Sequence, residues 1–135
     1  MGTSLVAPRQ IHTQQEHYLR AAVAFNSPDV ATAGKFPLGT LPAGAIITGG
    51  LVNIGTAFNA ATTNVLTVGT ATTADSIMAA GDVDETATGT TLAFGSVGTK
   101  VTVDTPLFIN YTQTGTAATA GAADIILFFV PDNDR

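Results

Sequence analysis

The stretch ADIILFFVP, residues 123–131, decides the fold class, because residues 125–130 are apolar without interruption and Pro131 ends the run. This run is far shorter than the roughly 20 apolar residues needed to span a bilayer, and a short apolar run is typical of a buried β-strand. A strand that is apolar on both faces belongs in the middle of a sheet, or has an outer face covered by another subunit. The stretch therefore predicts a β-sheet core.

The rest of the chain repeats this β-rich pattern in short runs, each closed by Gly, Pro or Asn. In 17–25, Leu19, Ala21, Val23 and Phe25 alternate with other residues, which favours a strand, although residues 14–24 also tolerate a helix on propensity. The further strand runs are 35–42, 45–55, 64–70, 90–94, 99–105 and 107–113. Together they predict about eight strands in one all-β domain, a jelly roll or antiparallel β-sandwich.

Three local features qualify this prediction. The Gly49–Gly50 pair predicts a bulge or sharp bend that divides its strand and lets the chain pass from one sheet to the other. Phe58 is the one large apolar side chain in a loop of small residues, so we expect it to close the end of the core. Residues 72–81 predict one short helix, with Thr73 or Asp75 as the N-cap and Gly81 at its end.

The composition indicates a protein that covers part of its surface with another molecule. The chain has 135 residues, the usual size of one domain, and no cysteine. Charged residues are only 11% of the chain, against about 25% in typical domains. With so little charge on its exterior, we expect a face that packs against copies of itself or another protein.

The charge is divided unevenly along the chain. Residues 1–16 are polar, contain Pro8 and read as an extended N-terminal arm, and residues 17–135 form the predicted domain. Residues 1–20 carry a net +1 and residues 21–135 a net −6, so the domain would repel nucleic acid. The opening MGTSLV has no secretory pattern, which indicates synthesis in the cytoplasm.

The arm and its junction contain the candidate partner-binding residues Arg9, His12, His17 and Arg20. These four residues make this part the locally basic region of an acidic chain. An arm of this kind extends across a neighbour and becomes ordered there. The alternative is a tail without a binding role.

The sequence offers little catalytic chemistry. It has two histidines, both in or beside the arm, and no glycine-rich phosphate loop, so we expect neither an enzyme nor a cofactor. Asp82, Asp84 and Glu85 form an acidic cluster of hard oxygen ligands that Ca²⁺ could use, but the cluster lacks EF-hand spacing. A solvated turn is the favoured interpretation of these three residues.

Residues 36–78, FPLGTLPAGAIITGGLVNIGTAFNAATTNVLTVGTATTADSIM, resemble capsid cement or decoration proteins of tailed bacteriophages with a jelly-roll fold. The resemblance implies a non-enzymatic homodimer or homotrimer on the outer capsid surface of the virion. Such a protein would bridge subunits of the major capsid protein and contact neither nucleic acid nor membrane. A tail-fibre or host-recognition module and a head-completion or tail component are the alternatives.

Overall fold

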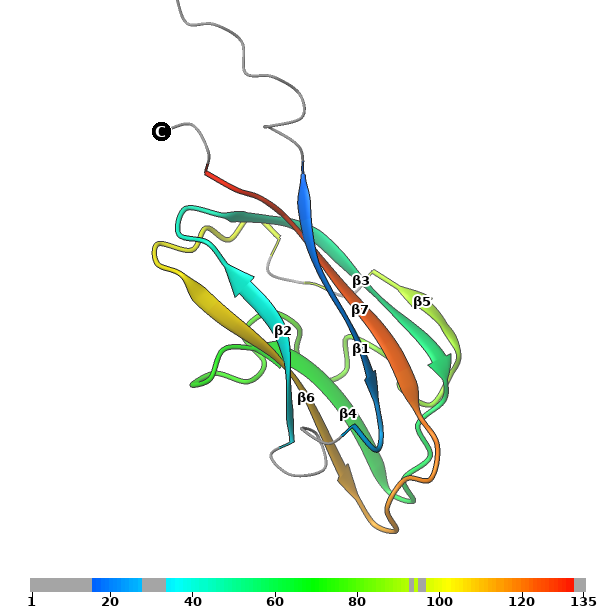
Figure 1. Cartoon of the computed structure of the whole chain (residues 1–135). Coiled ribbons are helices and arrows are strands. Elements are labelled where there is room, and N and C mark those ends of the chain that lie inside the picture. The colour runs from blue at the N-terminus through cyan, green and yellow to red at the C-terminus, as the bar shows by residue number, and fades with distance from the viewer. Residues whose placement is uncertain (1–15, 28–33, 93, 95–96, 133–135) are drawn as a thin grey trace, which may run out of the picture.

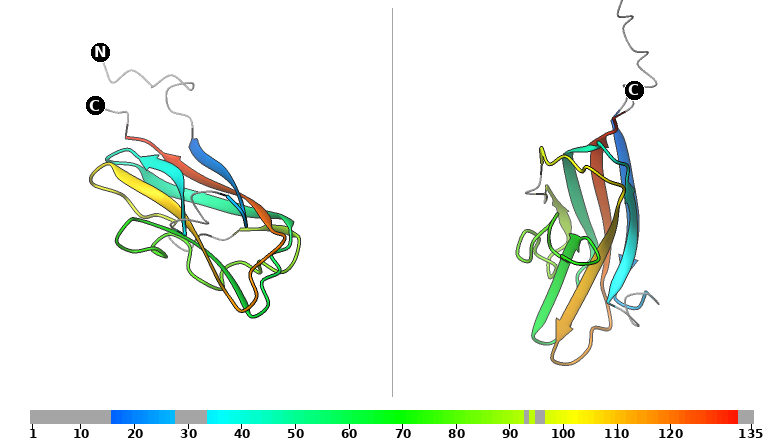
Figure 2. Two further views of the ribbon diagram at one scale, coloured as in Figure 1. Left: turned by 60° about the horizontal axis from the view of Figure 1, so that its bottom comes forward. Right: turned by 90° about the vertical axis from the view of Figure 1, so that its left-hand side faces the viewer.

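The computed structural model describes residues 16–27, 34–92, 94 and 97–132, and seven β-strands lie within them (Figure 1). The strands are β1 His17–Ala24, β2 Lys35–Leu41, β3 Ile46–Thr56, β4 Thr63–Gly69, β5 Gly89–Thr91, β6 Thr105–Thr114 and β7 Ala122–Val130. They form a four-stranded sheet in the order β1-β7-β3-β5 and a three-stranded sheet in the order β2-β6-β4. Figure 2 shows these two layers from two further directions.

The strand pairing is nested, which identifies the sandwich as a jelly roll. The first strand pairs with the last, β2 with β6, and β3 with β5, and every pair is antiparallel. Successive strands from the beginning of the chain enter alternate sheets, as in a long hairpin wound around a barrel. The predicted all-β fold is therefore confirmed.

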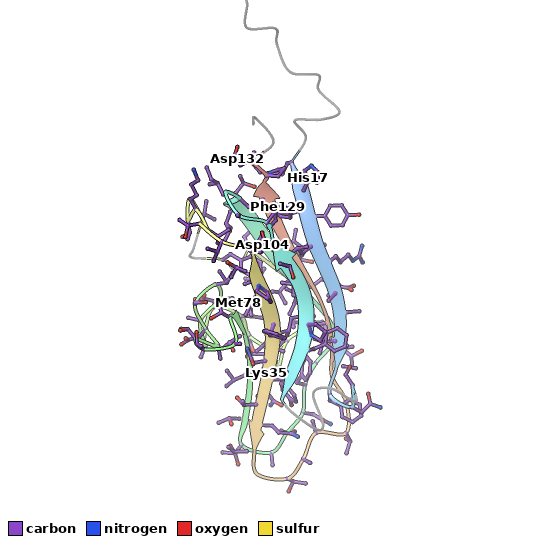
Figure 3. All side chains as sticks on the ribbon, turned by 60° about the vertical axis from the view of Figure 1, so that its left-hand side comes forward. His17, Lys35, Met78, Asp104, Phe129 and Asp132 are labelled. Atoms are coloured by element: carbon purple, nitrogen blue, oxygen red, sulfur yellow. The ribbon has the colours of Figure 1, made fainter. Side chains whose placement is uncertain are left out.

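The segment between β4 and β5 corrects the prediction of a helix over residues 72–81. These residues form turns, and Val68 of β4 makes an isolated antiparallel bridge to Met78. Figure 3 labels Met78 on this loop. Val68 donates its N–H to the Met78 carbonyl and accepts from Ile77 and Met78. Tertiary pairing thus overrides local helix propensity, and the bridge occupies the place of an eighth jelly-roll strand.

The position predicted for the apolar C-terminal run is confirmed, because β7 lies between β1 and β3. The Gly49–Gly50 prediction is half right. The register of β3 against β7 shifts between Ile47 and Gly49, which is a β-bulge. However, β3 continues in the same sheet to Thr56, so the bulge does not divide the strand.

One core fills the space between the two sheets. Phe58 is 2% exposed and its ring lies 4.8 Å from that of Tyr111, centroid to centroid, so it closes one end of the core as predicted. In the four-stranded sheet, the Phe94 ring lies over Gly50 of β3, where a Cβ atom would clash with the ring. Where β1 and β2 approach, the Leu19 side chain similarly occupies the space beside Gly39. The described residues contain no helix of the length and apolarity that crossing a membrane requires.

Candidate partner-binding surface

The outer face of the three-stranded sheet is covered in part by the chain itself. Asn110 of β6 points away from the core, yet it is buried, and its side-chain amide donates to the carbonyl of Ala74 at 3.0 Å. Gly69 lies so close to the backbone of Thr73 and Ala74 that a Cβ atom would overlap it. The loop after β4 therefore covers part of this face.

The same loop also closes the free edge of β4. Besides the bridge at Met78, the carboxylate of Glu85 accepts the backbone N–H of Leu66 at 2.7 Å. Glu85 is only 7% exposed, and its own carbonyl accepts the N–H of Phe58. An edge strand with unpaired N–H groups invites pairing with another chain, and these contacts remove that opportunity along β4.

The acidic cluster is thus split, and the structure brings no cation site together there. Asp82 accepts the N–H of Ala79, and Asp84 accepts both the N–H and the hydroxyl of Thr86. The hydrogen bond from the Thr86 hydroxyl is the main reason that the pKa of Asp84 lies below its usual value. Within the described ranges, no three His, Cys, Asp or Glu side chains gather as metal ligands. The solvated-turn interpretation fits Asp82 and Asp84 but is wrong for the buried Glu85.

The outer face of the four-stranded sheet carries several apolar side chains, and some of them are exposed. Strand alternation places every second residue of β1, β7 and β3 on this side, in rows set by the pairing register. We call the apolar residues of these rows the outer apolar face. Its members are Tyr18, Ile46, Leu51, Ile126, Phe128 and Val130. Tyr18 is 63% exposed, and Ile46 and Val130 are each 39% exposed.

Two polar contacts lie on this side of the sheet. Glu16 accepts a hydrogen bond from the Thr48 hydroxyl at one end. Arg20 forms an ion pair with Asp124 across the β1–β7 pair, with Nη2 and Oδ2 3.4 Å apart. Exposed ion pairs of this kind contribute little to stability, so their charges remain available to a partner.

A shallow hollow of about 220 Å³ adjoins the outer apolar face at the end farther from Val130. The outward residues of this end include the small residues Ala22, Ala24, Ala122 and Gly55, together with the polar Asn53 and Asp124. The face therefore carries bulky side chains at one end and a depression at the other.

The candidate arm residues fall into two groups. Arg9 and His12 lie outside the described residues. His17 and Arg20 both lie on β1 but point to opposite sides of the strand. His17 approaches the inward Phe129 ring, with centroids 5.8 Å apart, and Figure 3 shows both residues at the end of the sandwich near Asp132. Arg20 lies on the outer face beside Tyr18 and Asp124.

The sequence pointed to the outer residues of β7 through its uninterrupted apolar run, but it did not identify Tyr18, Ile46 or Leu51 as their neighbours. That grouping depends on the register of β7 against both flanking strands. An apolar outward residue in one strand alone gives no such signal.

Comparison with known proteins supports the fold described above. No protein-family model and no curated protein sequence matches this chain. Among solved structures, a chain of the cyanophage Pam1 capsid asymmetric unit aligns with 95% of this chain and 93% of its own, with a TM-score of 0.71 and 22% identity. A chain of the acidic stable capsid structure of Helicobacter pylori bacteriophage KHP30 aligns with 87% of this chain and 89% of its own, with a TM-score of 0.59 and 18% identity. At these identities the chain shares with both neighbours a complete β-sandwich fold.

Proposed function

We propose that this chain is a structural virion protein of a bacteriophage, which binds the outside of the capsid as a homo-oligomer and stabilises contacts between major capsid protein subunits. The observation that carries the proposal is the difference between the two outer faces of the sandwich. One is covered in part by the chain's own loop, and the other exposes Tyr18, Ile46 and Val130. A large exposed apolar patch marks a site of protein association.

The structural neighbours support a capsid as the assembly to which the chain binds. Both belong to phage capsid structures, and both align over nearly the full length of this chain. A capsid repeats the same contact many times by symmetry, so a small domain with one modest binding face gains occupancy through multivalency. The shortage of charge in the sequence fits a surface that is covered in the assembled particle.

The proposed role is structural, and the titratable side chains that the structure describes are engaged in packing and backbone contacts. The buried carboxylate of Glu85 is used by the backbone of β4, and the one described histidine, His17, lies against an aromatic ring. Acid–base catalysis requires a base within hydrogen-bond reach of a second reacting group. Because Glu85 and His17 are held in these contacts, we propose that the chain functions by binding.

As part of this proposal, residues 1–16 form an arm that contacts the capsid or a neighbouring copy through Arg9 and His12, with His17 and Arg20 at its junction. Deleting residues 1–15 tests it, because this deletion leaves Glu16 and the whole of β1 in place. We expect weaker capsid binding from the shortened protein at unchanged thermal stability. Unaltered capsid binding together with an unaltered oligomeric state would reject the arm.

A cryo-electron microscopy map of the virion that contains this protein tests the whole proposal. Hundreds of copies on the outer surface, between capsid subunits, are the expected result. A few copies at the tail or at one vertex would overturn it in favour of a host-recognition module or a completion protein. A map with no copies would show that the protein is not a component of the virion, and the proposal would be wrong.

A further inference from the structure

We propose that two copies of this chain pair through the outer apolar faces of their four-stranded sheets, about a two-fold axis that crosses the strands. This inference rests on the proposed homo-oligomer and assigns it a surface and a symmetry. The face exposes Tyr18, Ile46 and Val130 and contains the outward side of the central strand β7. Two sheets that pack face to face do so with their strands nearly aligned.

The shape of the face is complementary to itself about this axis. Take Arg20, Ile126 and Leu51, which lie side by side on β1, β7 and β3, as the middle row. Rotation about that row reverses the strand direction and keeps each strand opposite its own counterpart. The bulky end with Val130 then lies over the partner's small-residue hollow, and the partner's bulky end fills the hollow of the first copy. An isologous interface requires this reciprocal fit.

The charges on the face follow the same symmetry. Arg20 is in the middle row, and its ion-pair partner Asp124 is one row towards the hollow, on the neighbouring strand. The rotation brings the partner's Asp124 to the other side of the middle row, diagonally across from Arg20. Because Arg20 lies in the middle row, the rotation also places it opposite the partner's Arg20, and each guanidinium group is neutralised by the Asp124 carboxylate of its own chain.

The size of the face predicts a weak pair. Three long strands and the short β5, spaced ~4.8 Å apart and about nine residues long, cover roughly 500 Å² in projection. Stable complexes bury about 800 Å² per partner. We therefore expect a dimer that dissociates in the micromolar range and becomes permanent only when an assembly holds both copies.

Sedimentation velocity over a range of protein concentrations measures this dimer in the full-length protein. Ile126→Glu places a carboxylate at the centre of the face without touching the core, so it should weaken dimerisation by roughly 100-fold. Thr112→Glu is the control, because Thr112 is exposed on β6 of the other sheet. Circular dichroism melting should show that both variants remain folded. A wild-type protein that stays monomeric, or two variants that dimerise equally well, would overturn the pairing.

Cross-linking tests the axis, because the natural chain has no cysteine. With a short bis-maleimide, Ile126→Cys should cross-link to its own counterpart, whereas Thr112→Cys should not. Val130→Cys should not cross-link alone, since the eight residues from 122 to 130 separate the two copies by about 26 Å along the strand. It should cross-link when mixed with Ala122→Cys. Self-linking of Val130→Cys, or none by Ile126→Cys, would overturn the crosswise axis.

The two proposals fail separately. If the virion map places the protein on the capsid while the cross-links are absent, the sheet pairing is wrong and the structural role stands. If the cross-links form while the map shows few copies at the tail, the pairing stands and the capsid role is wrong.

Discussion

Gly121 shows how a single residue holds the end of the core closed. Its φ is +146°, and a Cβ atom there would lie 2.3 Å from Cδ1 of Phe58. Gly89 has nearly the same φ, +143°, but a Cβ atom would meet nothing within 4 Å. Substitution of either glycine should therefore strain the backbone, but only a side chain at position 121 would also clash with a packed neighbour.

We expect Gly89→Ala to lower the free energy of unfolding by about 1–3 kcal/mol through backbone strain. Gly121→Ala should cost about 1–3 kcal/mol more, because Phe58 must move out of its well-packed position. Urea unfolding of both variants measures the difference. Equal losses would mean that Phe58 yields without cost and does not close the core.

Tyr111 gives the protein an alkaline limit. Burial raises the pKa of this phenol above its usual value of 10.0, and the negative charge of Glu85 raises it further. The folded state therefore keeps the proton at a pH where the unfolded state releases it. Its contribution to stability is complete below pH 10 and is lost as the pH rises through the folded-state pKa.

Substitution of Glu85 tests this origin of the shift. In a Tyr18→Phe background, where Tyr111 is the only tyrosine, Glu85→Gln should lower the pKa of Tyr111 in an absorbance titration of the tyrosinate. The pKa should remain above the usual value, because burial is the larger cause. Asp82→Asn, at an exposed position of the same loop, is the control. An unchanged pKa in Glu85→Gln would contradict the electrostatic contribution of Glu85.

At the scale of the element, β4 behaves as an interior strand although it ends its sheet. The N–H of Leu66 is held by Glu85 and that of Val68 by the Met78 carbonyl. Both amides should exchange slowly with solvent, like those of Val65 and Thr67 that face β6. Hydrogen exchange followed by NMR measures each amide separately.

Glu85→Ala should accelerate exchange at Leu66 far more than at Val68, because it removes the acceptor of Leu66 alone. Leaving that buried N–H unpaired should also cost about 1–3 kcal/mol of stability. Asp82→Ala, which loses only a local turn contact, should change neither amide. Equal acceleration at Leu66 and Val68 would mean that the loop opens as one unit and that Glu85 does not hold Leu66 individually.

The elements that could be predicted from sequence are those in which hydrophobic period and burial agree. Period-2 alternation located β1 and β6, and an uninterrupted apolar run identified β7 as central. The helix predicted over residues 72–81 was wrong because helix propensity is a local property, whereas the bridge to Val68 depends on a distant strand. For the same reason the sequence predicted that Glu85 is exposed, because only the fold brings its side chain to the free edge of β4.

At the scale of the whole molecule, the net negative charge of the chain favours a protein as the partner over nucleic acid. The chain has five Lys and Arg residues against ten Asp and Glu, and Arg20 is paired with Asp124 on the open face. Binding to DNA requires several cations that neutralise phosphates together and release counterions. Contact through the apolar residues of the outer face requires no such cations. The proposed capsid contact should therefore be far less sensitive to salt than DNA binding.

We therefore expect no mobility shift of duplex DNA by this protein at low ionic strength, where nonspecific electrostatic binding is strongest. A variant in which Asp82, Asp84 and Asp104 are replaced by Lys is the matched control. These three carboxylates lie on exposed loops, and their replacement changes the net charge from −5 to about +1, so the variant should bind DNA more strongly than the natural protein, and added salt should weaken that binding. DNA binding by the natural protein would require a cluster of cationic groups that the described surface does not show. This result would contradict the proposal that the partner is a protein.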